Sequence, residues 1–169
     1  LHIAQVLMEP AMQEKIKAET RRPLAGLKVA CYYGCLLTRP RGAGIDDPED
    51  PHILEDLVRL LGAEPVDWRL RLDCCGASMA LPRADLVHEL SGKILAMAHK
   101  RGAEVLMVAC PMCHSNLDFQ QEKALKAVGQ SFKLPVLYLT QLVGLAFGLT
   151  ADQLGLGRHF VPVPVDRLL

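Results

Sequence analysis

Short apolar runs alternate along this chain with longer stretches in which apolar residues recur at helical spacing. A short unbroken apolar run is typical of a buried strand, and a spacing of three and four residues is typical of a helix with one buried face. We predict strands near residues 27–33, 64–68, 105–108 and 136–139. We predict helices over residues 2–18, 51–61, 85–100 and 110–128, and a last helix that begins near Thr140.

Capping residues and glycines support several of these boundaries. Asp47-Pro48 or Asp50-Pro51 offers a capping side chain followed by proline at the first helical position, and Gly62 ends that helix. Thr150 to Gln153 has the form of a capping box. The segment 39–48, rich in Gly, Pro and Asp, predicts a loop.

The alternation of strands and helices predicts an α/β fold with a mainly parallel sheet and helices on both of its faces. In such sheets ligands bind beyond the carboxyl ends of the strands. Cys35, the pair Cys74-Cys75, and Cys110 with Cys113 each follow a different predicted strand. We therefore expect these thiols to converge on one edge of the sheet.

The composition excludes some classes of function but does not identify one. The chain has 169 residues, half of them hydrophobic, which suits a single domain with its own core. Lys and Arg number 19, as do Asp and Glu, so no net charge favours nucleic acid or an anionic membrane. The apolar stretch 134–149 is interrupted and shorter than a membrane span needs.

Six cysteines in a domain of this size favour metal-binding thiols in a reducing compartment over a disulfide scaffold. The chain begins with Leu1 and has no basic segment followed by an apolar run, so we find no secretory signal. We expect a cytoplasmic domain that is part of a longer protein.

Cys110-Pro-Met-Cys113 lies at a predicted strand-to-helix junction, where free backbone N–H groups and the helix dipole favour thiolate. Alone it fits a redox dithiol, a zinc site or a cluster ligand pair. The adjacent Cys74 and Cys75 would point apart in a regular strand, so both reach one centre only if the backbone turns, which Gly76 permits.

Five thiols at one edge exceed the four that a tetrahedral zinc ion or a regular 4Fe-4S cubane requires. The surplus indicates an irregular multi-iron cluster, or a four-ligand site with one free thiol. A structural zinc site and a set of unrelated buried thiols are the alternatives.

Further residues near this edge allow two interpretations each. Cys31, on the strand before Cys35, is a buried structural thiol or a further ligand, and we favour burial. His114 is an exposed helix residue, which we favour, or a contributor to the metal site. Arg39 and Arg41 provide loop solubility or hold an anionic substrate.

The cysteine motif resembles the CCG motif in the B-type subunit of heterodisulfide reductase. It comprises Tyr33-Gly34-Cys35, then Cys74-Cys75-Gly76, then Cys110-Pro-Met-Cys113. The similarity extends over residues 31–40 (CYYGCLLTRP) and 135–148 (PVLYLTQLVGLAFG). Related CCG domains occur in components of glycolate, lactate and glycerol-3-phosphate oxidising enzymes.

The resemblance implies that Cys35, Cys74, Cys75, Cys110 and Cys113 bind a noncubane 4Fe-4S cluster. It implies that this chain, residues 1–169, is the second of two CCG domains in one polypeptide. The partners would be the N-terminal CCG domain, a C-type iron–sulfur protein that donates electrons, and an A-type flavoprotein of the same complex.

The implied activity is reduction of a disulfide substrate, of the type formed by coenzyme M and coenzyme B, with electrons from a partner protein. We expect the isolated domain to be inactive, because a disulfide needs two electrons. One alternative is a structural zinc-binding or docking domain. Another is an electron-transfer component of a glycolate, lactate or glycerol-3-phosphate oxidising complex.

Overall fold

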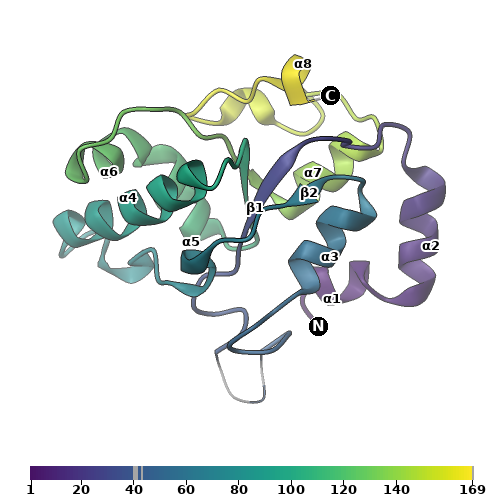
Figure 1. Ribbon diagram of the computed structural model, residues 1–169, viewed down its shortest axis with the longest axis horizontal. Coiled ribbons are helices and arrows are strands. Elements are labelled where there is room, and N and C mark those ends of the chain that lie inside the picture. Colours follow the sequence, from purple (N-terminus) through teal and green to yellow (C-terminus); the bar gives the residue numbers. More distant parts are fainter. Residues whose placement is uncertain (40–41, 43, 169) are drawn as a thin grey trace.

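The computed structural model describes residues 1–39, 42 and 44–168, and its centre is a parallel sheet (Figure 1). The strands follow the order β2-β1-β3-β4 and all run parallel. The central pair β1 and β3 is in register from Val29 opposite Val105 to Tyr32 opposite Val108. This confirms the predicted α/β fold with a parallel sheet. The strands are β1 (Lys28–Tyr32), β2 (Glu64–Pro65), β3 (Val105–Val108) and β4 (Val136–Tyr138).

Side chains alternate between the two faces of the strands, so the sheet has two separate hydrophobic cores. Val29 and Cys31 of β1 face one core, whereas Ala30 and Tyr32 face the other. The core around Val29 and Cys31 is covered by α1 (Ile3–Leu7), α2 (Pro10–Glu19), α3 (Ile53–Leu60) and α7 (Leu139–Ala146).

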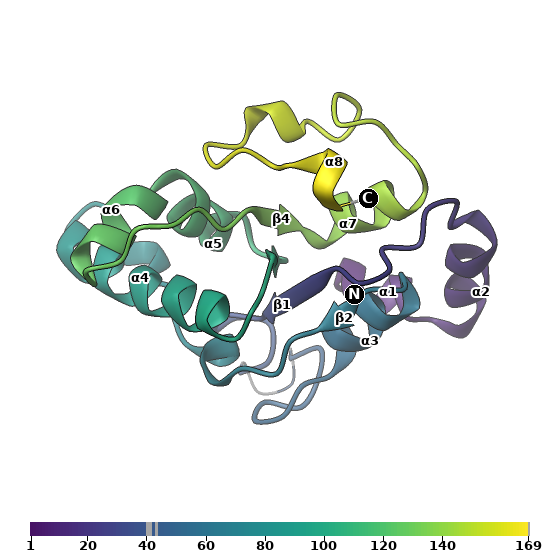
Figure 2. The ribbon, with the colours of Figure 1, turned by 45° about the horizontal axis from the view of Figure 1, so that its top comes forward.

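The core around Tyr32 is covered by α4 and by the chain that follows β3 (Figure 2). Ile94 and Leu95 of α4 meet Leu117 and Leu125 there, all at most 2% exposed. These elements are α4 (Ala84–Lys100), α5 (Pro111–His114), the π-helical segment η3 (Ser115–Phe119) and α6 (Gln121–Ala127).

Three predicted helices differ in detail from the structure. The stretch 2–18 forms two helices, because Pro10 begins α2 at its first position and cannot continue α1. The stretch 110–128 is divided into α5, η3 and α6. Neither Asp47 nor Asp50 caps α3: His52 is the N-cap residue, and Asp46 Oδ2 accepts from the backbone N–H groups of His52 and Ile53 at 2.6 Å.

Of two further predicted features, one is shorter than expected and one is confirmed. The strand predicted over 64–68 pairs only at Glu64 and Pro65, after which the chain enters the 3-10 turn η1 (Arg69–Leu72). The Thr150 capping box is present, since Gln153 N donates to Thr150 Oγ1 at 3.3 Å and Thr150 N to Gln153 Oε1 at 2.9 Å.

The C-terminal segment returns across the end of the sheet near β4 and α7 (Figure 2). It contains the 3-10 turn η4 (Leu156–Arg158) and α8 (Val165–Leu168). The buried carboxylate of Asp118 in η3 accepts from the backbone N–H groups of Phe160 (2.8 Å) and Val161 (3.1 Å). These two bonds fix the segment against the helix that follows β3.

Candidate metal centre

The loop after β1 brings Cys35 to the carboxyl edge of the sheet. Gly34 has a positive φ of 65° there, which a residue with a side chain rarely adopts. A Cβ at this position would also lie 3.3 Å from Cys113 Sγ. The backbone N–H groups of Tyr33 and Gly34 both donate to the carbonyl of Arg71 in η1, at 2.9 and 3.2 Å. The turn is therefore tied to the segment that leads to Cys74 and Cys75.

The neighbouring residues Cys74 and Cys75 contact different cysteines but remain at the same edge of the sheet, because the chain turns at Gly76, where φ is 81°. Gly76 is the N-cap residue of the 3-10 turn η2 (Ala77–Met79), and its N–H donates to Cys74 Sγ at 3.3 Å. Cys74 is exposed and lies 3.9 Å from Cys35, sulfur to sulfur. Cys75 is buried and lies 3.6 Å from Cys113 in the same measure.

The pair Cys110 and Cys113 comes from the junction of β3 and α5. Cys110 is the last residue before the helix, and Pro111 occupies the first helical position. Cys110 is half-buried and Cys113 is buried. The structure thus brings the thiols named from the sequence together as two close pairs, Cys35 with Cys74 and Cys75 with Cys113, and Cys110 lies next to Cys113.

Hydrogen bonds distribute the protons unequally between the two buried thiols. The hydrogen bond between the thiols of Cys113 and Cys75, with others from Asn116 and the Ala77 N–H, lowers the pKa of Cys75 to about 6 despite its burial. The same bond, burial and the neighbouring Cys110 raise the pKa of Cys113. Of the two buried thiols, Cys75 is therefore the one more readily present as thiolate, which is the form that binds metal.

Two polar residues that the sequence did not single out also contact the site. Asn116 Nδ2 lies 3.4 Å from the carbonyl oxygen of Cys75 and 3.6 Å from its sulfur, and the Asn116 side chain is buried. Ser91 Oγ of α4 donates to the same carbonyl at 3.3 Å. The position of Asn116 three residues after Cys113, on the same face of a helix, was the available signal.

Cys31 belongs to the opposite core, where it is fully buried on the face covered by α3 and α7. Its burial is confirmed, and burial raises the pKa of its thiol well above the ordinary value. His114 is not the exposed helix residue we favoured: it is half-buried, its Nε2 lies 3.1 Å from the Val136 carbonyl, and its ring stacks on Tyr138. Arg39 is exposed, and Arg41 lies outside the described residues.

The sulfur positions fit metal coordination. Two thiolates on one tetrahedral ion with metal–sulfur bonds of about 2.3 Å lie about 3.8 Å apart. Cys35 to Cys74 (3.9 Å) and Cys75 to Cys113 (3.6 Å) both have this spacing. With Cys110 next to Cys113, these residues could provide up to five thiol ligands, which would suit a polynuclear iron–sulfur group better than a single ion.

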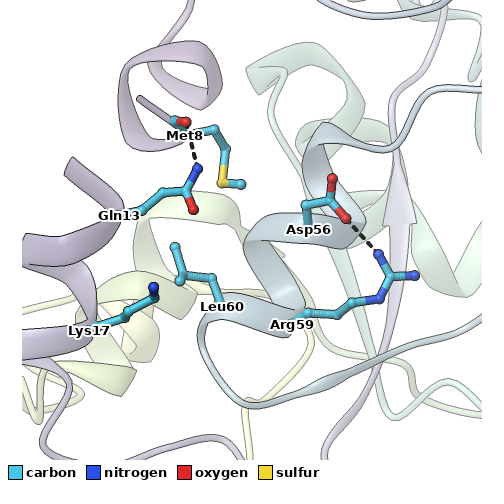
Figure 3. A pocket seen from close by; sticks show the side chains of 6 residues that line it. All are labelled: Met8, Gln13, Lys17, Asp56, Arg59 and Leu60. Atoms are coloured by element: carbon cyan, nitrogen blue, oxygen red, sulfur yellow. Dashed lines mark hydrogen bonds and ion pairs between the residues drawn. The ribbon is translucent and has the colours of Figure 1, made fainter. Parts of the chain in front are cut away.

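A hollow of about 490 Å³ lies on the opposite helical layer, between α2 and α3 (Figure 3). Its walls include the ion pair of Arg59 with Asp56 at 2.7 Å and the bond from Gln13 Nε2 to the Met8 carbonyl at 2.8 Å. None of the described cysteines lines it. It is therefore separate from the thiol centre.

Comparison with known proteins agrees with this geometry. Residues 29–118 match the family model described as the CCG cysteine-rich domain. The chain is 37% identical over 149 residues to the 8-methylmenaquinol:fumarate reductase membrane anchor subunit of Wolinella succinogenes, covering 88% of this chain and 52% of that protein. It is 36% identical over 163 residues to the B-type subunit of the ferredoxin:CoB-CoM heterodisulfide reductase from Methanosarcina mazei, covering 95% and 54%.

The chain therefore spans about half the length of the curated relatives it matches. Among solved structures, a hypothetical protein from Helicobacter pylori superposes with a TM-score of 0.62 at 13% identity, over 90% of this chain and 28% of that one. That likeness concerns the fold alone. Within the described part of the chain, no helix is both long and apolar enough to cross a membrane.

Proposed function

Since the chain belongs to the CCG cysteine-rich domain family, we propose that it is the cluster-binding domain of a heterodisulfide reductase-type oxidoreductase. The observation that carries the proposal is the pairing of thiols at one edge of the sheet, Cys35 with Cys74 at 3.9 Å and Cys75 with Cys113 at 3.6 Å, with Cys110 next to Cys113. The cofactor we propose is a noncubane 4Fe-4S cluster held by Cys35, Cys74, Cys75, Cys110 and Cys113.

When bound, such a cluster supplies electrons one at a time. Reductive cleavage of a disulfide consumes two electrons and two protons and yields two thiols. In this chain Asn116 and the Gly76 N–H donate hydrogen bonds to Cys75 and Cys74, which stabilises negative charge on the sulfurs. Cys74 is exposed and Cys35 partly so, so this side of the centre is open to a substrate or a partner.

The relatives support a place in a larger complex. The Methanosarcina mazei protein is part of a CoB-CoM heterodisulfide reductase, and the Wolinella succinogenes protein is part of a fumarate reductase. We propose that a second CCG domain lies elsewhere in the same protein, with a C-type iron–sulfur protein and an A-type flavoprotein as partners. All six cysteines are free thiols, which suits a reducing compartment such as the cytoplasm.

Anaerobic reconstitution with iron and sulfide tests the proposal. We expect about four irons per chain with brown visible absorption. Cys35→Ser should lower the iron content sharply, because this thiol contacts Cys74. Cys31→Ser is the matched control and should leave the content nearly unchanged, because Cys31 lies in the opposite core. Stoichiometric zinc without iron uptake would instead support a structural zinc domain.

Activity provides a second test. The isolated chain should show little disulfide reductase turnover with an artificial electron donor, and the full-length protein with its donor should show it. Sustained turnover by these 169 residues alone would refute the need for a second domain. A cluster that forms and transfers electrons to a flavoprotein, without disulfide reduction in the complete complex, would favour the electron-transfer alternative.

A further inference from the structure

A second group of metal-ligand side chains lies on the β4 side of α5 and contains no thiol. One ligand atom from each of His114, Asp118 and His159 lies within 4.8 Å of the others. His114 and Asp118 are four residues apart on the helical segment after β3, and His159 comes from the C-terminal segment. We call these three residues the His–Asp–His cluster.

The carboxylate of this cluster has no cationic partner in the described part of the chain. Asp118 is only 2% exposed, and its oxygens accept from the backbone N–H groups of Phe160 and Val161. Among the described residues, no Lys, Arg or His forms an ion pair with it. Buried carboxylates are normally paired with a cation or bound to a metal. A positive group at this place would therefore stabilise the Asp118 carboxylate.

His114 keeps one ring nitrogen available for a ligand, and His159 offers Nδ1 once its ring proton has moved to Nε2. His114 Nε2 donates to the Val136 carbonyl at 3.1 Å, which leaves Nδ1 with its lone pair. A backbone carbonyl that holds the outer nitrogen is the usual arrangement for a metal-ligating histidine. His159 Nδ1 is buried and has no hydrogen-bond partner in the described part of the chain.

The spacing leaves room for an ion between the three groups. The rings of His114 and His159 meet edge to face, with centroids 4.8 Å apart, and no hydrogen bond joins either ring to Asp118 in the described residues. Nitrogen and oxygen ligands at about 2.0–2.1 Å from a tetrahedral metal lie about 3.3–3.4 Å apart. Side-chain rotations that shorten the longest separation, 4.8 Å, by about 1.4 Å would close the site.

We propose that His114, Asp118 and His159 bind a divalent transition-metal ion of the Zn²⁺ class. Two imidazoles and one carboxylate are ligands that Zn²⁺ accepts, and they leave a fourth position for water. The ion neutralises Asp118 and connects the C-terminal segment to the helix that carries Cys110 and Cys113. This site is independent of the thiol centre and of the cofactor proposed there.

Gln141 provides a specific check on this assignment. Its Oε1 accepts from the Tyr138 N–H at 2.9 Å, and its Nε2 donates to the Leu154 carbonyl at 3.0 Å and lies 2.9 Å from His159 Nε2. A metal on Nδ1 places the ring proton on Nε2, so the amide must give up its present contact with His159. A carboxylate here would accept that proton and strengthen metal binding.

The experiment titrates Co²⁺ into the reduced chain under anaerobic conditions after the thiol centre has been filled. Iron and sulfide fill that centre, or Zn²⁺ does if no iron is taken up, so failure of the cluster proposal leaves this test intact. We expect one further Co²⁺ per chain, with the weak visible bands of nitrogen and oxygen ligands. An intense thiolate charge-transfer band is not expected.

Three variants complete the test. His159→Ala should lose at least about 100-fold in Co²⁺ affinity, more than most changes outside the ligand set. Gln141→Glu should gain about tenfold, which a purely structural polar cluster would not do. His99→Ala removes a ring that stacks on Phe132 rather than on a residue of the cluster, and this variant should bind like the parent chain. Absence of the additional Co²⁺, or equal affinity in His159→Ala, would overturn the proposal.

Discussion

Replacement of Tyr33 by Phe removes one hydroxyl that serves two buried partners behind the thiol loop. The Tyr33 hydroxyl donates to Glu55 Oε2 and accepts from the Leu54 N–H at 2.9 Å. Tyr33 is 1% exposed and Glu55 is 4% exposed. Arg71 Nη1 also contacts Glu55 at 3.3 Å, so the hydroxyl completes a network between β1, α3 and η1.

The magnitude follows from the groups that lose their partner. The variant leaves a buried backbone N–H and a buried carboxylate oxygen, and each unsatisfied group costs about 1–3 kcal/mol. Because Arg71 still contacts Glu55, the loss in the free energy of unfolding should be smaller than the sum of the two largest costs, and we expect about 3 kcal/mol. For a domain of this size that corresponds to a fall of about 6–12 °C in Tm.

The assay is guanidinium unfolding of the reduced, metal-free chain under anaerobic conditions, followed by circular dichroism. The midpoint should fall with an unchanged m value, since the surface exposed on unfolding is the same. Tyr138→Phe is the control, because the Tyr138 ring stacks on His114 and its hydroxyl makes no hydrogen bond within residues 1–39, 42 and 44–168. A loss below about 0.5 kcal/mol, or equal losses in both variants, would refute this reasoning.

Three further predictions concern the same region. Burial raises the pKa of Glu55, so its contribution to stability is full below the unfolded value of 4.5 and is lost as pH rises through the folded pKa. Glu55→Gln should remove this decline of the denaturation midpoint with rising pH. Parallel plots of midpoint against pH for the parent chain and the variant would contradict the prediction. Gly34→Ala should reduce the metal content per chain, because φ is 65° and the new Cβ would lie 3.3 Å from Cys113 Sγ. Gly129→Ala is the control and should retain metal, because Gly129 has a similar φ of 67° but open space around it. Equal metal content in the two variants would show that the crowding at Gly34 is unimportant. Dioxygen should oxidise the metal-free chain to a disulfide between Cys75 and Cys113, because their sulfurs are 3.6 Å apart. Mass spectrometry of alkylated peptides would identify the linked cysteines, and a random mixture of pairings would contradict the prediction.

The sheet and the meeting of the thiols could be predicted from the sequence, because each signal was local. Apolar runs marked β1, β3 and β4, and glycines marked the turns at Gly34 and Gly76. Parallel topology then placed the strand ends at one edge without further information. The five cysteines were therefore found together, while their role as ligands stays a proposal.

What the sequence could not provide depends on contacts between distant segments. Glu55 lies in a predicted amphipathic helix, where a glutamate is normally solvated, yet tertiary packing buries it beside Tyr33. His114 was expected in solvent because no local pattern indicates that β4 and the C-terminal segment cover it. The aspartate that accepts from the backbone N–H groups at the start of α3 was misassigned because three aspartates precede the helix, and only their geometry selects Asp46.

The strand order β2-β1-β3-β4 leads us to expect an order of events during folding. Pairing of β1 with β2 can bring Cys35 to Cys74 across 39 residues, but Cys75 reaches Cys113 only once β3 has paired on the other side of β1. We expect the pairing of β3 with β1 to come later, because closing the long loop between these strands costs chain entropy before the contacts between them form. A chain emerging from the ribosome would therefore hold part of the proposed sulfur ligand set in place first. Cofactor insertion before β3 has docked would find only three thiols, so cellular maturation of this domain should follow completion of the sheet.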